Sequence, residues 1–88
     1  MTFRHFAIFV AVCDSGSMTE AAQRLSISQP SVSQAVKELE ACYGTTLFER
    51  LGKSLVLTTA GELCLDYARR ILRSRDELSE AMRGVENS

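Results

Sequence analysis

Residues 17–44, SMTEAAQRLSISQPSVSQAVKELEACYG, predict two capped helices joined by a short turn. Ser17 and Glu20 have the spacing of a capping box, in which each side chain binds the backbone amide of the other residue. The first of the two helices is therefore expected to begin at Met18. The small side chains that follow it would allow a neighbouring helix to approach closely.

The second helix has its own start and stop signals. Ser28 is an N-cap candidate, and Pro30 lies in the first turn after it, where a missing amide hydrogen and a fixed φ are tolerated. Gly44 can adopt the left-handed conformation that ends a helix. Apolar side chains recur between these signals at steps of three and four, which predicts a buried stripe: Val32, Ala35, Val36, Leu39 and Tyr43.

The opposite face of this second helix is polar over its first two turns. A short helix followed by such a helix is typical of a helix-turn-helix that enters the major groove of DNA. Glutamine can pair with the edge of adenine, and serine can pair with several groups in the groove. The alternative is an ordinary solvated helix face. The candidate DNA-binding residues in this region are Ser28, Gln29, Pro30, Ser31, Ser33, Gln34 and Lys37.

Composition limits the chain to one modest soluble domain. It has 88 residues, 45% of them hydrophobic, and a net charge of −1. No apolar run is long enough to span a membrane and the N-terminus lacks a signal-peptide pattern, so a cytoplasmic protein without a membrane partner is expected. The slight negative charge argues mildly against nucleic acid, since phosphate neutralisation provides most non-specific affinity.

Neither a metal site nor an active site is expected. Cys13, Cys42 and Cys64 are widely separated, and His5 is the only histidine, so we interpret the cysteines as packing residues rather than metal ligands or redox centres. No nucleophile has a neighbouring base, and no glycine-rich phosphate loop is present. We therefore expect no cofactor, no metal and no enzymatic activity.

The flanking segments predict a supporting helix and a hairpin. Residues 3–13 carry an aromatic apolar face that would cover the two helices: Phe3, Phe6, Ala7, Phe9, Val10 and Cys13. Residues 47–50 and 55–58 are short strand-like runs on either side of a tip that contains Gly52. This two-stranded wing would present Arg50 and Lys53.

The last segment predicts a long helix from about Thr59, where Thr59 and Glu62 suggest another capping box and Gly61 would permit close packing. It is longer than a small core needs, and its apolar surface is broad enough for two partners: its own domain near the start and a second copy of the chain beyond. The alternative is an exposed tail that frays. The candidate dimerisation residues are Leu63, Tyr67, Ile71, Leu72, Arg75, Leu78 and Met82.

At these spacings the chain resembles the N-terminal DNA-binding domain of LysR-type transcriptional regulators. The resemblance runs from about Phe3 to Leu72 and includes the SQPxxS and LFER motifs. It rests on Ser17, Ala21, Ala22, Leu25, Ser28, Gln29, Pro30, Ser33, Val36, Leu39, Glu40, Gly44, Leu47, Phe48, Arg50, Leu57, Thr58 and Gly61.

The resemblance implies a mainly α winged helix-turn-helix (residues 1–58) followed by a linker helix (residues 59–88) that pairs antiparallel in a homodimer. The partner would be double-stranded DNA at a partly palindromic, often AT-rich promoter site. Gln29 and Pro30 match the base-contacting start of the family's recognition helix. A small-molecule effector would act only through a C-terminal domain that this chain does not contain.

Further roles follow for residues outside the recognition helix. The resemblance implies that Ser33 is an outward polar position, that Ser17 and Thr19 lie beside phosphates at a helix start, and that Lys53 lies at the minor groove or its phosphates. Arg50 could contact phosphate or brace the wing against an acidic residue.

The charges of residues 17–58 cancel, so we expect weak, salt-dependent non-specific binding. The acidic composition keeps a second hypothesis open, in which the winged helix binds another protein instead of DNA.

Overall fold

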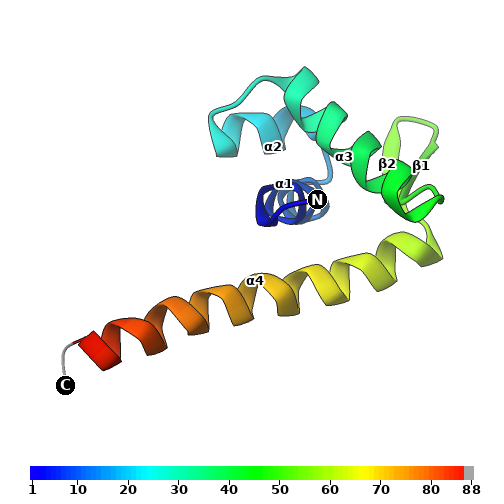
Figure 1. Ribbon diagram of the computed structural model, residues 1–88. Coiled ribbons are helices and arrows are strands. Elements are labelled where there is room, and N and C mark those ends of the chain that lie inside the picture. Colours follow the sequence, from blue (N-terminus) through cyan, green and yellow to red (C-terminus); the bar gives the residue numbers. More distant parts are fainter. Residues whose placement is uncertain (87–88) are drawn as a thin grey trace.

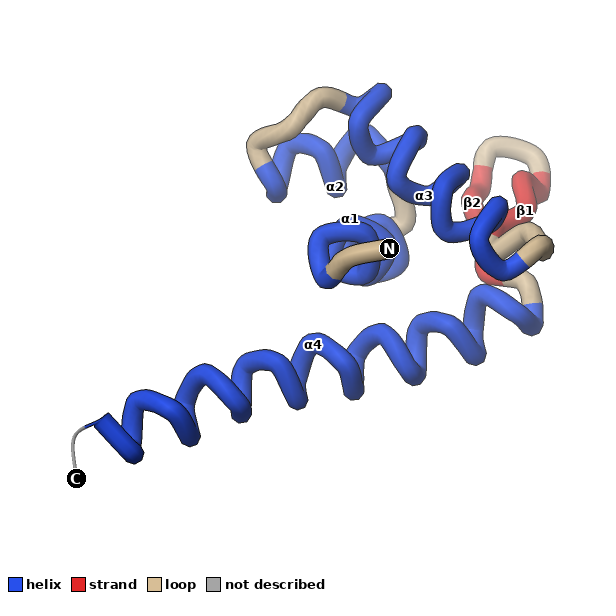
Figure 2. Tube along the Cα trace, viewed as in Figure 1, coloured by secondary structure: helices blue, strands red, loops and turns tan. Residues whose placement is uncertain are grey.

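The computed structural model describes residues 1–86 and consists of four helices and one hairpin (Figure 1). Figure 2 shows that the hairpin lies at one end of the recognition helix and that the last helix runs beneath the other elements. The predicted mainly helical winged helix-turn-helix with a long fourth helix is confirmed. In chain order the elements are α1 (Phe3–Ser15), α2 (Met18–Leu25), α3 (Gln29–Tyr43), β1 (Phe48–Leu51), β2 (Ser54–Leu57) and α4 (Thr59–Glu86).

Helix α1 lies between the helix-turn-helix and α4, as the end-on view of α1 in Figure 1 shows. Ile8 and Val12 pack against α2 and α3, whereas Phe9 packs against Ala68 of α4 and against Leu39 of α3. The prediction that the aromatic face of α1 covers the next two helices is therefore wrong in part. That face is turned mainly toward α4, and the side that covers α2 is aliphatic.

The helix boundaries form as the capping residues predict. The Ser17 hydroxyl accepts a hydrogen bond from the Glu20 amide at 3.2 Å, and the Ser28 hydroxyl accepts one from the Ser31 amide at 3.2 Å. The turn between α2 and α3 contains an unpredicted feature. Ser26 ends α2 with φ of 56°, a left-handed conformation that is uncommon for any residue with a Cβ atom.

The buried stripe of α3 is confirmed except at its last position. Val32, Ala35, Val36 and Leu39 are buried, but the side chain of Tyr43 is 54% exposed. Tyr43 instead borders an apolar hollow beside α4. One stripe of α3 is therefore buried, and the polar side chains at the start of the helix lie outside it.

The wing is a hairpin with a two-residue loop. Leu51 pairs with Ser54 across that loop, and Gly52 has φ of 63°, which glycine adopts without strain. Each strand is displaced by one residue from the predicted run: β1 begins after Leu47 and β2 ends before Thr58.

Thr58 connects the wing to α4. Its hydroxyl donates a hydrogen bond to the Thr46 carbonyl oxygen at 2.7 Å and accepts one from the Gly61 amide at 2.9 Å. The cap of α4 is therefore Thr58 rather than the predicted Thr59. Gly61 packs against the Leu47 backbone so closely that a Cβ atom would overlap the Leu47 carbonyl oxygen, which confirms the predicted close packing.

Helix α4 extends beyond the body of the domain. Its 28 residues rise roughly 42 Å at about 1.5 Å per residue. Ala68 is buried against α1, and Arg69 pairs with Asp14 of α1 at 2.8 Å. No helix among residues 1–86 is both long and apolar enough to cross a membrane. Residues 87 and 88 of the predicted linker segment lie outside the described part.

Two ion pairs at helical spacing lie along α4, between Asp66 and Arg70 and between Glu80 and Arg83. Arg73 and Glu77 have the same spacing but form no ion pair within the described residues. The outer surface of α4 therefore carries local ion pairs close to the body and near its far end.

The cysteines differ in environment. Cys13 and Cys64 are half-buried beside the core between α1 and α4, as expected of packing residues. Burial, assisted by the adjacent Asp14 carboxylate, raises the pKa of Cys13 to about 12. Cys42 is exposed on α3, so the prediction that all three cysteines pack is wrong for this residue.

Candidate nucleic-acid interface

The starts of α2 and α3 converge with the wing on one concave surface. A hollow of 160 Å³ is lined by the N-terminal turn of α2, by the first residue of α3 and by the basic side chains of the hairpin. Five predicted site residues therefore lie together although they are up to 36 positions apart: Ser17, Thr19, Gln29, Arg50 and Lys53. We call this the wing-side hollow.

The same surface continues along α3. Ser33 and Lys37 border a second hollow of 180 Å³ together with Arg50, Glu40 and Glu49. Lys37 is exposed and Ser33 is half-buried, with its hollow open to solvent. Because these residues follow Gln29 at steps of four, they form one row along the side of α3 that faces the wing.

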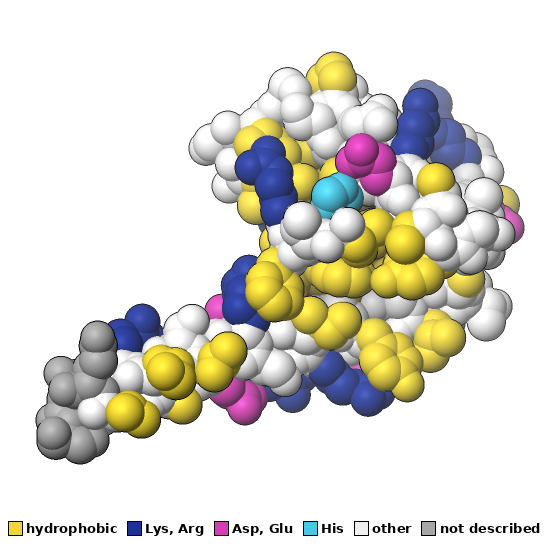
Figure 3. All heavy atoms as spheres, in the orientation of Figure 1, with side chains coloured by type: hydrophobic (Ala, Val, Ile, Leu, Met, Phe, Trp, Pro, Cys, Tyr) yellow, Lys and Arg dark blue, Asp and Glu magenta, His cyan; other side chains and the backbone are white. Residues whose placement is uncertain are grey.

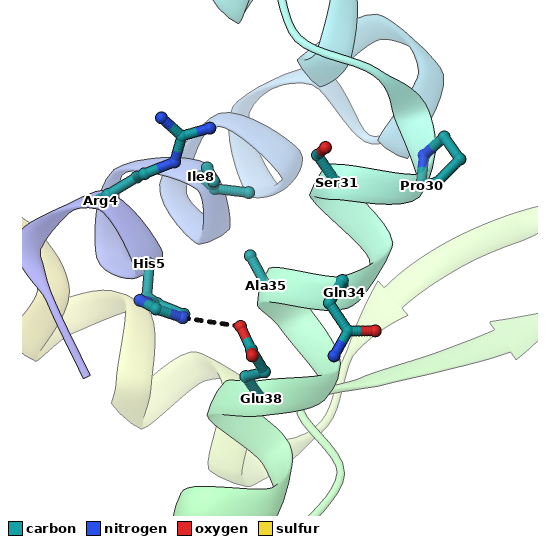
Figure 4. Close-up of a pocket in the computed structure, with 8 residues that line it drawn as sticks. All are labelled: Arg4, His5, Ile8, Pro30, Ser31, Gln34, Ala35 and Glu38. Atoms are coloured by element: carbon teal, nitrogen blue, oxygen red, sulfur yellow. Dashed lines mark hydrogen bonds and ion pairs between the residues drawn. The ribbon is translucent and has the colours of Figure 1, made fainter.

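Three other predicted residues lie on the opposite side of α3. Pro30, Ser31 and Gln34 line a hollow that α1 closes, with a volume of 490 Å³ (Figure 4). We call this the α1-side hollow. Figure 4 shows α1 and the wing on opposite sides of α3, so the polar residues of the recognition helix face both ways.

The α1-side hollow contains one interhelical hydrogen bond. His5 Nε2 of α1 donates to Glu38 Oε1 of α3 at 2.9 Å (Figure 4). This hydrogen bond lowers the pKa of Glu38 below its ordinary value. The acidic residue nearest the first turns of α3 is therefore held by a side chain of α1.

Ser28 has a structural task at the start of α3. Its hydroxyl caps the helix and lies 2.7 Å from the Ser31 hydroxyl. Ser28 is exposed, as its predicted role in DNA binding requires, but its hydroxyl already accepts the hydrogen bond of the Ser31 amide.

The reading head comprises α1, α2, α3 and the wing, and its basic side chains are available to an anion. Within the described residues, every arginine that forms an ion pair lies on α4: Arg69, Arg70, Arg75 and Arg83. Those of α1, α2, α3 and the wing form none: Arg4, Arg24, Lys37, Arg50 and Lys53. In Figure 3, dark blue side chains lie on both sides of the cyan histidine. The charges of residues 17–58 sum to zero, but the basic side chains are placed where an anion can reach them.

Arg50 has two predicted roles, which are contact with phosphate or bracing of the wing against Glu40 or Glu49. Arg50 forms no ion pair with Glu40 or Glu49 within residues 1–86. Glu40 instead accepts a hydrogen bond from the Leu47 amide at 2.7 Å, which fixes the loop before the wing. The guanidinium of Arg50 is exposed beside two hollows that border α3.

A separate apolar surface follows α4. A hollow of 380 Å³ lies between Phe6, Tyr43 and the first half of α4, and exposed apolar side chains continue toward the far end (Figure 3). Among the candidate dimerisation residues the exposed ones are Leu63, Tyr67, Leu78 and Met82, and the half-buried ones are Ile71, Leu72 and Arg75.

The sequence did not indicate that basic residues of α1 would lie beside α3. Arg4 and His5 lie beside α3 although more than 20 residues separate them from it in the chain. The only local signal was the occurrence of two adjacent basic residues at the start of an otherwise apolar helix. Tertiary packing, and no local pattern, brings them to the recognition helix.

Comparison with known proteins gives consistent matches over nearly the whole chain. Residues 3–62 match the family model described as a bacterial regulatory helix-turn-helix protein of the lysR family. The RuBisCO operon transcriptional regulator of Allochromatium vinosum is 44% identical over 88 residues, which cover 97% of this chain and 29% of that protein. The activator CmpR of a Synechocystis strain is 38% identical, over 92% of this chain and 27% of that protein. The chain thus spans less than a third of the length of these relatives.

Solved structures show the same arrangement. The DNA-binding domain of CbnR in complex with DNA has a TM-score of 0.91 and 39% identity, covering 97% of this chain and 98% of that chain. The DNA-binding domain of BenM in complex with catB site 1 DNA has a TM-score of 0.95 and 32% identity, and the match covers 100% of this chain and 99% of that chain.

Proposed function

This chain belongs to the lysR family of bacterial regulatory helix-turn-helix proteins, and we propose that its head reads double-stranded DNA by inserting α3 into the major groove. The chain is a helix-turn-helix DNA-binding domain of that family. One observation supports the mode of reading: the exposed polar start of α3 lies between the cap of α2 and the basic wing in one concave surface. The polar side chains of that surface are suited to base edges in a groove, and its basic side chains are suited to the flanking phosphates.

The proposed base contacts come from the first two turns of α3. Gln29 is suited to the adenine edge, Pro30 to a thymine methyl group, and Ser33 to a donor or acceptor in the groove. Lys37 continues the contacts on the wing side of α3, and Ser31 and Gln34 add contacts on the α1 side. Ser28 would contribute mainly by fixing the first turn.

The proposed phosphate contacts surround the base-reading helix. Ser17 and Thr19 lie at the start of α2, where helix amides and hydroxyls attract an anion. Arg50 and Lys53 supply positive charge from the wing, and neither forms an ion pair within the described residues. Such contacts position the protein on the duplex without selecting a sequence.

We propose further that two copies associate through α4, which would place two recognition helices on a partly palindromic promoter site. The candidate interface is the apolar surface of α4, whose exposed leucine, tyrosine and methionine side chains would otherwise remain in water. In this proposal residues 1–58 read DNA and residues 59–88 join the copies. The structure of full-length CbnR in complex with its target DNA shares this fold over 94% of the present chain.

The proposal extends to the role of the whole protein. Its relatives are transcriptional regulators rather than enzymes, so we assign the chain to transcription regulation in the cytoplasm, without catalytic activity. A small-molecule effector would be sensed only by a separate C-terminal domain.

Selection of bound sites from a random pool of duplexes tests the base-reading proposal. The wild-type chain should enrich a two-fold symmetric motif, and Gln29→Ala should relax one base position by about 1–3 kcal/mol. Gln23→Ala is the matched control, because Gln23 is an exposed glutamine on α2. Failure of the wild-type chain to enrich any motif would favour the protein-binding alternative.

Sedimentation of the same chain tests the dimer. Leu78→Glu should shift the chain toward monomer, because it puts a charge on the α4 surface at a side chain that is 61% exposed. Leu51→Glu in the wing is the control, with a leucine that is 63% exposed away from α4. Equal effects of the two substitutions would contradict the α4 interface.

A further inference from the structure

Arg4 occupies a position that the proposed base-reading and wing contacts do not explain. It lies in the first turn of α1, is exposed, and lines the α1-side hollow with Ser31 and Gln34 of α3. Its guanidinium forms no hydrogen bond or ion pair within residues 1–86. Figure 4 shows Arg4 pointing away from the hydrogen-bonded His5 and Glu38.

The two sides of α3 carry positive charge from different elements. Arg50 and Lys53 of the wing border the side that contains Gln29, and Arg4 of α1 borders the side that contains Ser31. The α1 and wing segments lie on opposite sides of α3 in Figure 4. Positive side chains therefore flank the recognition helix on both sides.

The dimensions of DNA give this arrangement a meaning. A helix about 10–12 Å across fills a major groove about 12 Å wide, so each side of the helix faces a different sugar-phosphate strand. With α3 in the groove, the wing cations approach one strand. The α1 side must approach the other strand, and Arg4 is the basic residue that lines the hollow there without a partner.

The neighbouring acid does not block this contact. Glu38 lies in the same hollow and carries a negative charge, but its carboxylate is held by a hydrogen bond from His5 at 2.9 Å, and Arg4 points away from that pair (Figure 4). That bond directs the carboxylate toward α1. The bidentate guanidinium of arginine is well matched to a phosphate group.

We propose that Arg4 is a phosphate-binding residue that contacts the DNA strand opposite to the strand contacted by the wing. This inference rests on the proposed insertion of α3 into the major groove. It assigns α1 two tasks, since the same helix fills the core and grips the second strand. The contact is independent of base sequence, because phosphates are identical along the duplex.

Three variants of the chain test the charge of Arg4: Arg4→Gln, Arg4→Lys and the control Arg73→Gln. Arg73 is an exposed arginine of α4 that also forms no ion pair within the described residues. Binding to a selected duplex and to a scrambled duplex is measured over a range of salt concentrations, with circular dichroism to establish that each variant is folded.

Arg4→Gln should weaken binding to both duplexes by roughly five- to tenfold and reduce the salt slope by about 0.9 per protomer. Arg4→Lys should keep the salt slope, and Arg73→Gln should behave as wild type. Equal behaviour of Arg4→Gln and Arg73→Gln would overturn the inference while leaving the proposed function intact. If the folded wild-type chain bound neither duplex, the proposed function would be overturned and this inference with it.

Neutral phosphates locate the contact. Single methylphosphonate substitutions are introduced along each strand, and duplex binding by wild type and by Arg4→Gln is compared at each position. The phosphate that Arg4 contacts is the one whose neutralisation weakens binding by wild type but not by Arg4→Gln. The same scan with Lys53→Gln identifies the phosphate under the wing. The two positions should fall on opposite strands. Positions on the same strand would refute the assignment even if Arg4 were shown to bind phosphate.

Discussion

Replacing Gly61 by alanine should destabilise the domain, although alanine is the better helix former. A Cβ atom at this position would overlap the Leu47 carbonyl oxygen and lie 2.8 Å from Leu57 Cδ2. Overpacking of this kind costs about 1–3 kcal/mol. Separation of the two segments would also weaken the 3.0 Å hydrogen bond from the Thr58 amide to Leu47, a loss of about 1 kcal/mol. The gain in helix propensity is about 1 kcal/mol, so we expect a net loss of about 2 kcal/mol.

Urea and thermal unfolding at a fixed protomer concentration measure this loss. For a domain of this size it corresponds to a melting temperature lower by about 8–16 °C. Gly84→Ala is the matched control on the same helix, because a Cβ atom there would meet no atom within 4 Å. We expect that variant to be as stable as wild type or more stable by up to about 1 kcal/mol. Stability of Gly61→Ala equal to that of Gly84→Ala would refute the close-packing argument.

Three further predictions concern single side chains. Ser26→Gly should stabilise the domain in urea unfolding by up to about 1 kcal/mol, because it relieves a left-handed conformation without removing any side-chain hydrogen bond; a loss of stability would contradict this. The hydrogen bond from His5 holds the folded-state pKa of Glu38 below its ordinary value, so its stabilising contribution is complete above that ordinary value and is lost as the pH falls through the folded-state pKa. The acid limb of the stability profile should therefore become shallower in His5→Gln, and an unchanged limb would exclude the contribution of that hydrogen bond. At pH 8 the exposed Cys42 should react with a thiol reagent in the native state long before Cys13, whose raised pKa and burial keep it protonated; Cys42→Ser should remove the fast phase.

Local signals in the sequence were sufficient for the helix boundaries of the reading head. Ser17 and Ser28 cap their helices through side-chain hydrogen bonds to residues three positions on, and a bond of that range can be inferred from spacing alone. Gly44 ends α3 with φ of 64°, again a property of one residue. The error at the start of α4, where Thr58 replaces Thr59 as the cap, arose because two adjacent threonines offer the same local chemistry.

Long-range packing could not be predicted in the same way. An amphipathic pattern shows which face of α1 is apolar but not which elements cover it, so the contact of the aromatic side with α4 was not predicted. Tyr43 fits the period of the buried stripe, yet α3 extends past the core there and leaves it exposed. The approach of Arg4 and His5 to α3 depends on the angle between two helices, which no spacing within either helix encodes.

The position of α1 between the head and α4 has a mechanical consequence. In a dimer joined through α4, the angle at which each recognition helix meets its groove would depend on the thickness of α1, set on one side by Ile8 and on the other by Phe9. A change in the volume of either side chain would therefore change the tilt of the recognition helix relative to α4. The distance between half-sites that the protein prefers could then change in evolution without alteration of a single residue that touches DNA.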